Sequence, residues 1–215
     1  MAEQSNTALI AASAEKTPLY TMGRGKAWLI THVFFPVRYH HAERMEMDAP
    51  YILISNHESL LDPFIVAGCC KKYEIRFLGK KELTKNKVLS FLVSKVHMIP
   101  VDRHNNDISA MRKCAKVLRE GRVLGIFPEG TRHHDDLMST IESGTAVLAL
   151  RSKVPLLPVY LSRKPRLFSP IDAYVGSPLD IQDLCSEGFD SVHVQTLTDR
   201  IKQCFYALRD ETKNG

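Results

Sequence analysis

Short apolar runs alternate with amphipathic segments along most of the chain. The apolar runs are rich in β-branched residues, which favour strands. They are YILIS (51–55), IRFLG (75–79), HMIPV (97–101), RVLGIF (122–127), PLLPVYL (155–161) and, later, IDAYVGSPL (171–179). Segments with a helical pattern separate most of them, at about 63–70, 82–94, 107–119 and 143–152. This alternation predicts an α/β domain with a largely parallel sheet flanked by helices.

The two ends of the chain carry different helical patterns. Near the C-terminus a run of apolar residues shares one helical face: Val194, Leu197, Ile201, Cys204, Phe205 and Leu208. Near the N-terminus AWLITHVFFPV (27–37) is apolar over eleven residues, too few for a spanning helix, which needs about twenty. Polar residues from Thr17 to Arg38 form a narrow stripe beside a wide apolar face that includes Trp28. A membrane-interface helix is the favoured interpretation, and a helix packed on the domain's own core is the alternative.

These patterns predict two parts, an N-terminal helical membrane-interface segment (1–40) and an α/β domain (41–215). A length of 215 residues and a hydrophobic content of 44% suit one sizeable core. The five cysteines include no CxxC motif, which argues against a disulfide framework or a thiolate zinc site and favours a reducing compartment. The first residues lack the pattern of a secretory signal.

Positive charge is concentrated in one segment. Residues 71–95 hold eight Lys and Arg against Glu74 and Glu82, a net charge of +6, whereas the whole chain has +5. Such a block suits anionic lipid or a phosphate-rich ligand, although a merely solvated helix surface remains an alternative. The block has few interleaved aromatic residues, so no nucleic-acid partner is expected.

The segment ISNHESLLDPF (54–64) places a His and an Asp five residues apart. On a continuous helix this spacing would turn the two side chains about 140° apart. Because a strand is expected before the segment and Asp62–Pro63 suits a helix start, with Asp62 at the N-cap, His57 should lie in a turn and fold back toward Asp62. The second such pair, His97 and Asp102, falls on an expected strand, where the side chains would point to opposite faces.

Three polar segments directly follow expected strands. They are NHESLLD (56–62), VDRHNND (101–107) and FPEGTRHHDD (127–136). Since open α/β sheets form their crevices at the carboxyl ends of the strands, we expect the three segments to converge there.

These motifs carry a resemblance to a known family. NHESLLD followed by FPEGTR resembles the glycerolipid acyltransferase superfamily, the PlsC-like lysophosphatidate and glycerophosphate acyltransferases. MIPVDR and VPLLPVYL resemble two further motifs of that family in the expected order, so the resemblance spans about residues 50–180. The chain departs from the family at His97, where relatives often have Gly, and at His133, where they often have Ser. Both positions border the expected acceptor pocket, so the identity of the acceptor stays open.

The resemblance implies transfer of an acyl group from a thioester to a lysolipid hydroxyl, with His57 as general base and Asp62 orienting it. Histidine side chains ordinarily titrate close to neutral pH, which suits proton abstraction from an alcohol. Ser59 is the competing nucleophile, but the Gly-x-Ser-x-Gly turn that exposes such a serine is missing.

The resemblance also implies a set of acceptor-binding residues in the same motifs. They are Asn56, Arg103, Glu129, Gly130, Thr131 and Arg132. The two arginines suit a phosphate, because guanidinium pairs with two phosphate oxygens, although a structural ion pair with Asp102 or Glu129 is the alternative. Glu129 would bind the acceptor hydroxyl, and Gly130 would form a close turn.

The expected partners are an acyl-CoA or acyl carrier protein donor, a lysophospholipid acceptor and an anionic membrane surface. Lysophosphatidate is the family's commonest acceptor, and phospholipid biosynthesis on the cytoplasmic side of the membrane, as a peripheral or monotopic protein, is the expected setting. No cofactor is expected, and no metal, because the adjacent residues His133 to Asp136 rarely converge on one ion. Another lysolipid acceptor, a lipid-phosphate-binding module without turnover, and a thioesterase are the alternatives.

Overall fold

A computed structural model of the protein describes residues 33–81, 98–101, 108–130, 136–185 and 190–214. Within these residues seven strands form one sheet, in the order β1-β7-β6-β2-β5-β3-β4. The strands are β1 (Val37–His40), β2 (Ile52–Ser55), β3 (Ile75–Lys80), β4 (Ile99–Val101), β5 (Val123–Ile126), β6 (Leu156–Leu161) and β7 (Ile171–Val175). Among these strands β6 and β7 pair antiparallel, and the other neighbours pair parallel.

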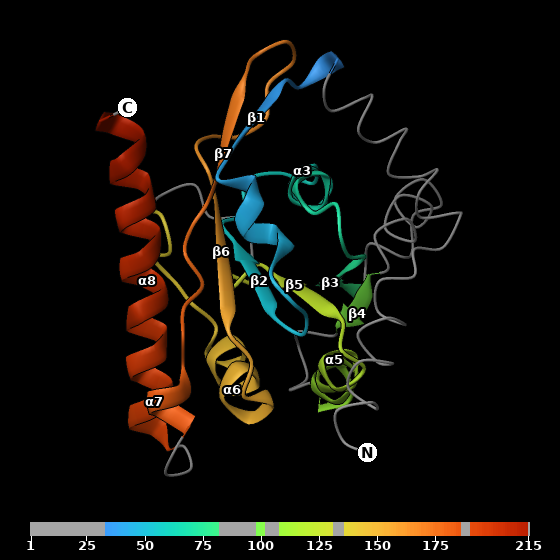
Figure 1. Ribbon diagram of the computed structural model, residues 1–215, viewed down its shortest axis with the longest axis vertical. Coiled ribbons are helices and arrows are strands. Elements are labelled where there is room, and N and C mark those ends of the chain that lie inside the picture. Colours follow the sequence, from blue (N-terminus) through green and yellow to red (C-terminus); the bar gives the residue numbers. More distant parts are fainter. Residues whose placement is uncertain (1–32, 82–97, 102–107, 131–135, 186–189, 215) are drawn as a thin grey trace.

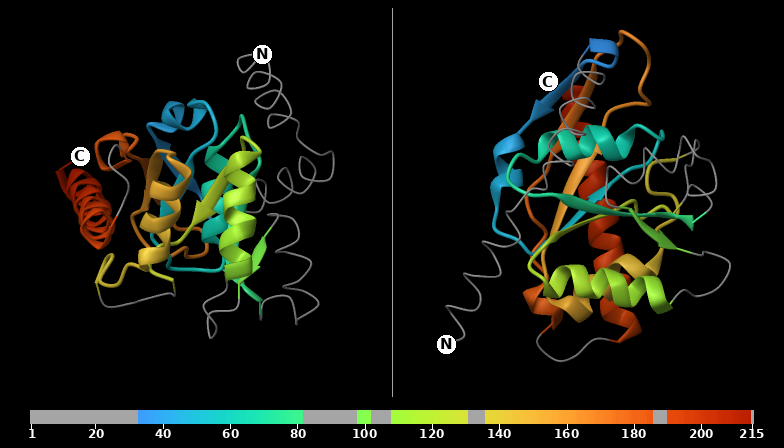
Figure 2. Two further views of the ribbon diagram at one scale, coloured as in Figure 1. Left: turned by 90° about the horizontal axis from the view of Figure 1, so that it is seen from below. Right: turned by 90° about the vertical axis from the view of Figure 1, so that its right-hand side faces the viewer.

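Helices cover both faces of the sheet (Figures 1 and 2). On one face lie the 3-10 helix η1 (Ala42–Glu46) and α3 (Asp62–Cys69), which pack on one buried cluster. On the other face lie α5 (Ile108–Arg119), α6 (Ser143–Ser152), α7 (Gln182–Cys185) and α8 (Ser191–Asn214), which pack on a second cluster. This three-layer arrangement and the largely parallel sheet confirm the predicted fold class.

The central strand β2 shows why the apolar runs form strands. Ile52 and Ile54 point into the cluster under α5, α6 and α8, whereas Leu53 points into the cluster under α3. All three are fully buried. A strand buried on both faces reads as a continuous apolar run, and this is how the runs at 51–55, 122–127 and 155–161 could be recognised.

One strand was not predicted. The segment VRYH, residues 37–40, forms β1 at the edge of the sheet beside β7. The prediction of a helical segment through residue 40 is therefore wrong for its last four residues. Strand β1 alternates, since Val37 and Tyr39 pack on the cluster under α3 and Arg38 pairs with Asp172 of β7 at 2.8 Å. The rest of that segment, up to residue 32, and the helix expected at 82–94 lie outside the described residues.

The C-terminal helix has the predicted apolar face. Leu197, Ile201 and Phe205 of α8 are fully buried, and the helix packs on α6 and β6. The short helices η1 and α7 were not predicted. Within the part of the chain that the structure describes, no helix has both the length and the apolar character needed to cross a membrane.

Candidate active site

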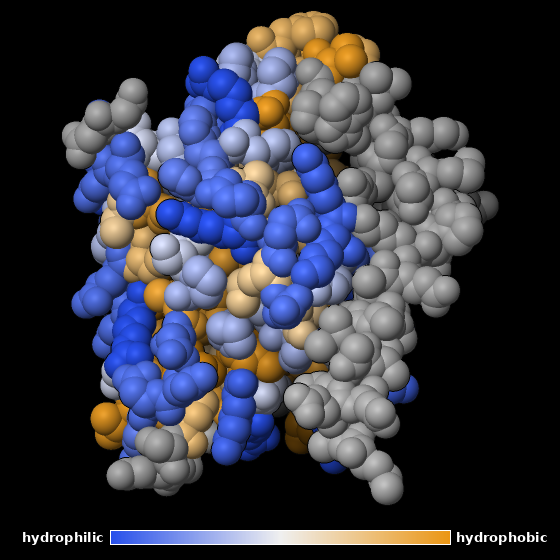
Figure 3. All heavy atoms as spheres, viewed as in Figure 1, coloured by the Kyte–Doolittle hydropathy of each residue, from blue (hydrophilic) through white to orange (hydrophobic). Residues whose placement is uncertain are grey.

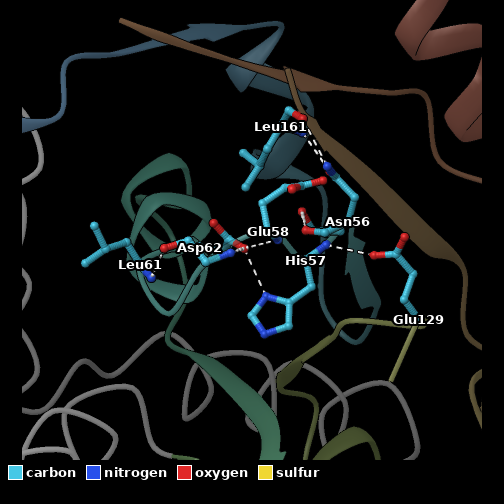
Figure 4. Close-up of polar contacts among 9 residues, drawn as sticks. Asn56, His57, Glu58, Leu61, Asp62, Glu129 and Leu161 are labelled. Atoms are coloured by element: carbon cyan, nitrogen blue, oxygen red, sulfur yellow. Dashed lines mark hydrogen bonds and ion pairs between the residues drawn. The ribbon is translucent and has the colours of Figure 1, made fainter. Parts of the chain in front are cut away.

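The candidate site lies at the carboxyl ends of β2 and β5. These strands are parallel neighbours, with Ile54 beside Ile126, so the chain leaves both of them at the same edge of the sheet. NHESLLD follows β2 as a turn that leads into α3, and FPEG follows β5. His57 and Glu129, 72 positions apart, are therefore brought together, as the sequence predicted for their two segments (Figure 4).

His57 and Asp62 form a direct pair. The Nδ1 atom of His57 lies 2.9 Å from Oδ2 of Asp62, and the same oxygen accepts the backbone N–H groups of Glu58 at 2.7 Å and Ser59 at 2.6 Å. The Asp62 side chain is fully buried, and 16% of the His57 side chain is exposed. Because a carboxylate oxygen only accepts hydrogen bonds, Nδ1 carries the proton, and Nε2 is the ring nitrogen left to take one.

The expected N-cap role of Asp62 is wrong. Asp62 is the first residue of α3, and Leu61 stands at the N-cap without a side-chain hydrogen bond. The Asp62 carboxylate turns back onto the preceding turn, where Oδ2 accepts all of its hydrogen bonds. Its other oxygen, Oδ1, is buried and has no hydrogen-bond partner among the described residues. Through Oδ2 the Asp62 carboxylate therefore orients the turn and the imidazole rather than the helix.

Two aromatic rings that the sequence analysis missed support the imidazole. The ring of His57 stacks on Phe127 with centroids 4.3 Å apart, and Phe127 stacks on Phe77 at 5.8 Å. Gly125 makes room for this stack, since a Cβ there would lie 2.5 Å from the Phe77 ring. Phe127 opens the FPEGTR motif, and this was the available signal for its presence at the site.

Asn56 and Glu129 use their polar atoms to clamp the backbone around His57. The side-chain amide of Asn56 exchanges two hydrogen bonds with the backbone of Leu161, at 3.0 and 2.8 Å. Glu129 accepts the backbone N–H of His57 at 2.9 Å with one oxygen and that of Met138 at 3.0 Å with the other. Both side chains are buried. They thereby fasten the turn after β2 to the ends of β6 and β5.

Gly130 forms a tight turn directly after Glu129. Its φ is +70°, a conformation that favours glycine, and a Cβ at this position would lie 2.8 Å from Cγ of Glu142. The Gly130 N–H donates to the carbonyl of Phe127 at 3.0 Å, and the N–H of Glu142 donates to that of Pro128 at 2.8 Å. The expected turn is present, and close approach of a substrate to it stays a prediction.

The described structure brings together five of the predicted site residues, which are Asn56, His57, Asp62, Glu129 and Gly130. The other three, Arg103, Thr131 and Arg132, lie outside the described residues, as do His97 and Asp102 of the second pair and His133 to Asp135. Among the residues that are described, no group of three or more His, Cys, Asp or Glu side chains is arranged to hold a metal ion.

Comparison with known proteins identifies the class. A family model described as "Acyltransferase" matches residues 36–162, which include the whole described site. The chain therefore belongs to the acyltransferase family, and the predicted resemblance and the enzyme class of O-acyltransferases are confirmed.

Individual relatives agree with this assignment. The 1-acyl-sn-glycerol-3-phosphate acyltransferase of Streptococcus pneumoniae is 31% identical over 182 residues, which cover 81% of this chain and 67% of that protein. The enzyme of the same name from Bacillus subtilis is 30% identical over 175 residues, 78% of this chain and 87% of its own length. The crystal structure of the 1-acyl-sn-glycerophosphate acyltransferase PlsC from Thermotoga maritima has the same fold, with a TM-score of 0.68 and 20% identity over 99% of this chain and 83% of that one.

Proposed function

We propose that the protein transfers an acyl group from an acyl thioester, acyl-CoA or acyl carrier protein, to the free hydroxyl of a lysophosphatidate-like acceptor. The observation that carries this proposal is the His57–Asp62 pair, in which a fully buried carboxylate holds Nδ1 at 2.9 Å and leaves Nε2 for proton transfer. The names of the relatives support lysophosphatidate as the acceptor.

In the proposed reaction His57 acts as general base. Its Nε2 takes the proton of the acceptor hydroxyl as the oxygen attacks the thioester carbonyl carbon. The tetrahedral intermediate then collapses, the carbon–sulfur bond breaks, and the imidazolium returns the proton to the leaving thiolate. Asp62 stabilises the imidazolium between the two proton transfers.

Direct transfer requires no covalent intermediate on the protein, and the described nucleophiles favour it. The Ser59 hydroxyl accepts the backbone N–H of Leu61 at 3.2 Å, as part of the local turn. Burial raises the pKa of every cysteine thiol, to about 12 for Cys114 and about 11 for Cys204, and in the same direction for Cys69, Cys70 and Cys185. Thiols held protonated at neutral pH are poor acyl acceptors.

The remaining assignments rest on the motifs. Arg103 and Arg132 are proposed to grip the acceptor phosphate, with Thr131 beside them, and the segment up to residue 32 together with the basic block at 71–95 is proposed to dock the protein on the cytoplasmic surface of an anionic membrane. The buried clamps made by Asn56 and Glu129 suit positioning of His57 as well as the contact with the acceptor that the resemblance implies.

Release of free thiol tests the proposal. With an acyl thioester and a panel of lysophospholipids, thiol should appear only when an acceptor is present, and acylated product should appear in equal amount. Thiol release without any acceptor would indicate a thioesterase, and no release with any acceptor would indicate a binding module. An acyl-enzyme trapped on Ser59 by rapid quench would contradict direct transfer.

A further inference from the structure

The exposed apolar side chains of the protein concentrate at one tip. Most of the large hydrophobic side chains that are exposed among the described residues belong to this tip. They are Val33 (52% exposed), Phe34 (42%), Leu167 (59%) and Phe168 (64%). They come from the segment before β1 and from the loop between β6 and β7. Figure 3 shows hydrophobic side chains gathered at the end of the molecule where β7 begins.

The loop holds its apolar residues outward in a defined turn. The N–H of Ser169 donates to the carbonyl of Arg166 at 3.1 Å, so Leu167 and Phe168 occupy the two central positions of a turn. A central turn position with positive φ usually carries Gly, Asn or Asp. Phe168 adopts φ +55°, a conformation that is uncommon for a bulky residue. A large apolar side chain at this position is costly for folding alone, which indicates a role outside the folded chain.

The two halves of the tip are fastened to each other. The N–H of Phe168 donates to the carbonyl of Phe34 at 2.6 Å, and the two rings lie with centroids 5.8 Å apart. The Arg163 guanidinium donates to Ser169 Oγ at 2.8 Å and to the carbonyl of Pro170. Val33, Phe34, Leu167 and Phe168 therefore form a preformed apolar projection, which we call the wedge.

Positive charge surrounds the wedge. Arg163, Lys164 and Arg166 are exposed, and the segment 162–171 contains no Asp or Glu. The nearest carboxylate along the chain, Asp172 at the base of the loop, already pairs with Arg38 at 2.8 Å and His40 at 2.9 Å. An apolar tip with a basic rim complements a bilayer whose headgroups are anionic and whose interior is apolar.

The wedge also lies at the end of the molecule that carries the candidate active site. Strand β6 is parallel to β2, so the loop after Leu161 leaves the sheet at the same edge as the turn that carries His57 (Figure 1). Asn56 links the two directly through its hydrogen bonds to Leu161. A surface that receives the wedge therefore faces the edge of the sheet where the candidate site opens.

We propose that the turn Arg166–Ser169, with Val33 and Phe34, inserts its apolar side chains into an anionic phospholipid surface while Arg163, Lys164 and Arg166 contact the headgroups. The turn at 166–169 lies outside the N-terminal segment (1–40) from which membrane docking is expected, whereas Val33 and Phe34 belong to that segment. Docking through the wedge rests on the proposed function in that the acceptor is drawn from a membrane, and it explains how a lysolipid could pass from the bilayer to His57.

Vesicle flotation of the full chain tests the wedge. The double variant Leu167→Ser/Phe168→Ser should have an affinity for vesicles of phosphatidylcholine with phosphatidylglycerol that is lower by about tenfold or more. Two exposed apolar side chains would no longer be buried in lipid. Val192→Ser is the matched control. Val192 is 66% exposed at the start of α8, at the opposite end of the molecule, and this variant should bind vesicles like the wild type.

Two further variants test the basic residues and the apolar tip one at a time. Lys164→Gln/Arg166→Gln should weaken binding by about fivefold for each charge removed on anionic vesicles, and should leave binding to pure phosphatidylcholine unchanged. In a Trp28→Phe background, Phe168→Trp supplies a single fluorophore at the tip. Its emission should shift to the blue on vesicles, and brominated lipids should quench it.

The results that overturn the proposal are distinct from failure of the proposed function. Unchanged partitioning of the double variant, or a Trp at position 168 that brominated lipids do not quench, would rule out the wedge. A wild-type dimer that the double variant loses, with unaltered vesicle binding, would assign the tip to self-association instead. If the wild type binds vesicles through the tip but transfers no acyl group to a short-chain, monomeric acceptor, the proposed function is wrong and the docking surface stands.

Discussion

Two histidine–aspartate pairs in this protein have almost the same contacts. In the turn before α3, one oxygen of Asp62 accepts two backbone N–H groups and lies 2.9 Å from Nδ1 of His57. At the start of α8, one oxygen of Asp190 accepts the backbone N–H groups of Val192 and His193 and lies 2.8 Å from Nδ1 of His193. Distance and hydrogen-bond count therefore do not distinguish a candidate catalytic pair from a helix cap.

The surroundings distinguish them. Asp62 is fully buried and His57 is 16% exposed, whereas 64% of Asp190 and 29% of His193 face solvent. His57 also stacks on Phe127 and lies at the carboxyl end of a central strand. Away from water a hydrogen bond to a charged group is stronger and its geometry is better held. The same local motif thus caps a helix at the surface and, in the turn after β2, holds a largely buried imidazole, which is the proposed base.

The largest effect should follow removal of the His57 imidazole, with removal of the His193 imidazole as the control. We expect His57→Ala to lower kcat/KM for acyl transfer by about 10²- to 10⁴-fold, the usual loss with a general base, while circular dichroism and the melting temperature stay near those of the wild type. His193→Ala, which removes the matched imidazole at the surface, should leave kcat/KM unchanged. Equal losses in the two variants would show that neither pair is the catalytic one.

A smaller loss should follow replacement of the Asp62 carboxylate, with replacement of Asp190 as the control. Asp62→Asn keeps the shape but weakens the hold on Nδ1, so steady-state kinetics should show a drop in kcat of about ten- to a hundredfold, as for other groups that orient a histidine. Asp190→Asn should not change kcat. A normal kcat for Asp62→Asn would contradict the orienting role, and a loss confined to KM would place Asp62 in binding instead.

The sequence could predict the central strands because β2, β5 and β6 are buried on both faces and read as apolar runs. It missed β1, a four-residue edge strand in which Val37 and Tyr39 face the core and Arg38 pairs with Asp172. Only two apolar positions alternate in so short a segment, which is too few to predict a strand from the pattern, and the pairing with β7 is what defines it.

The candidate site was predictable to the extent that it lies within one local segment. His57 and Asp62 are five residues apart, and their turn could be inferred from the strand before it and the proline after it. The clamps could not be inferred, because Asn56 reaches Leu161 across 105 positions and Glu129 reaches His57 across 72. Those contacts depend on the register of β6 and β5 against β2, which no local pattern reveals.

The aromatic stack on His57 should contribute less to catalysis than the Asp62 carboxylate. Phe127→Leu keeps an apolar side chain but removes the ring beneath His57, and aromatic pairs are worth about 0.5–1.5 kcal/mol beyond their burial. We expect kcat to fall by about two- to tenfold, less than in Asp62→Asn. Stopped-flow or steady-state assays at saturating acceptor would measure it. A change in KM alone would show that the ring contacts substrate rather than supporting the imidazole.

The smallest effect concerns Asp190 and pH. The backbone N–H of His193 and its ring, followed by the N–H of Val192, hold the pKa of Asp190 below its ordinary value of 3.8. A carboxyl whose pKa is lowered by folding stabilises the native state above its ordinary pKa, and this contribution is lost as the pH falls through the lowered folded-state value.

Asparagine at this position can still cap α8 but has no charge. The melting temperature of Asp190→Asn should therefore lie slightly below that of the wild type at neutral pH, and the difference should shrink as the pH falls below about 4. Added salt should reduce the difference at neutral pH, because Asp190 is exposed and its interactions are screened. If the wild type instead gains stability relative to the variant as the pH falls below about 4, folding raises the pKa of Asp190, and the surface pair does not act as the charged helix cap that its contacts indicate.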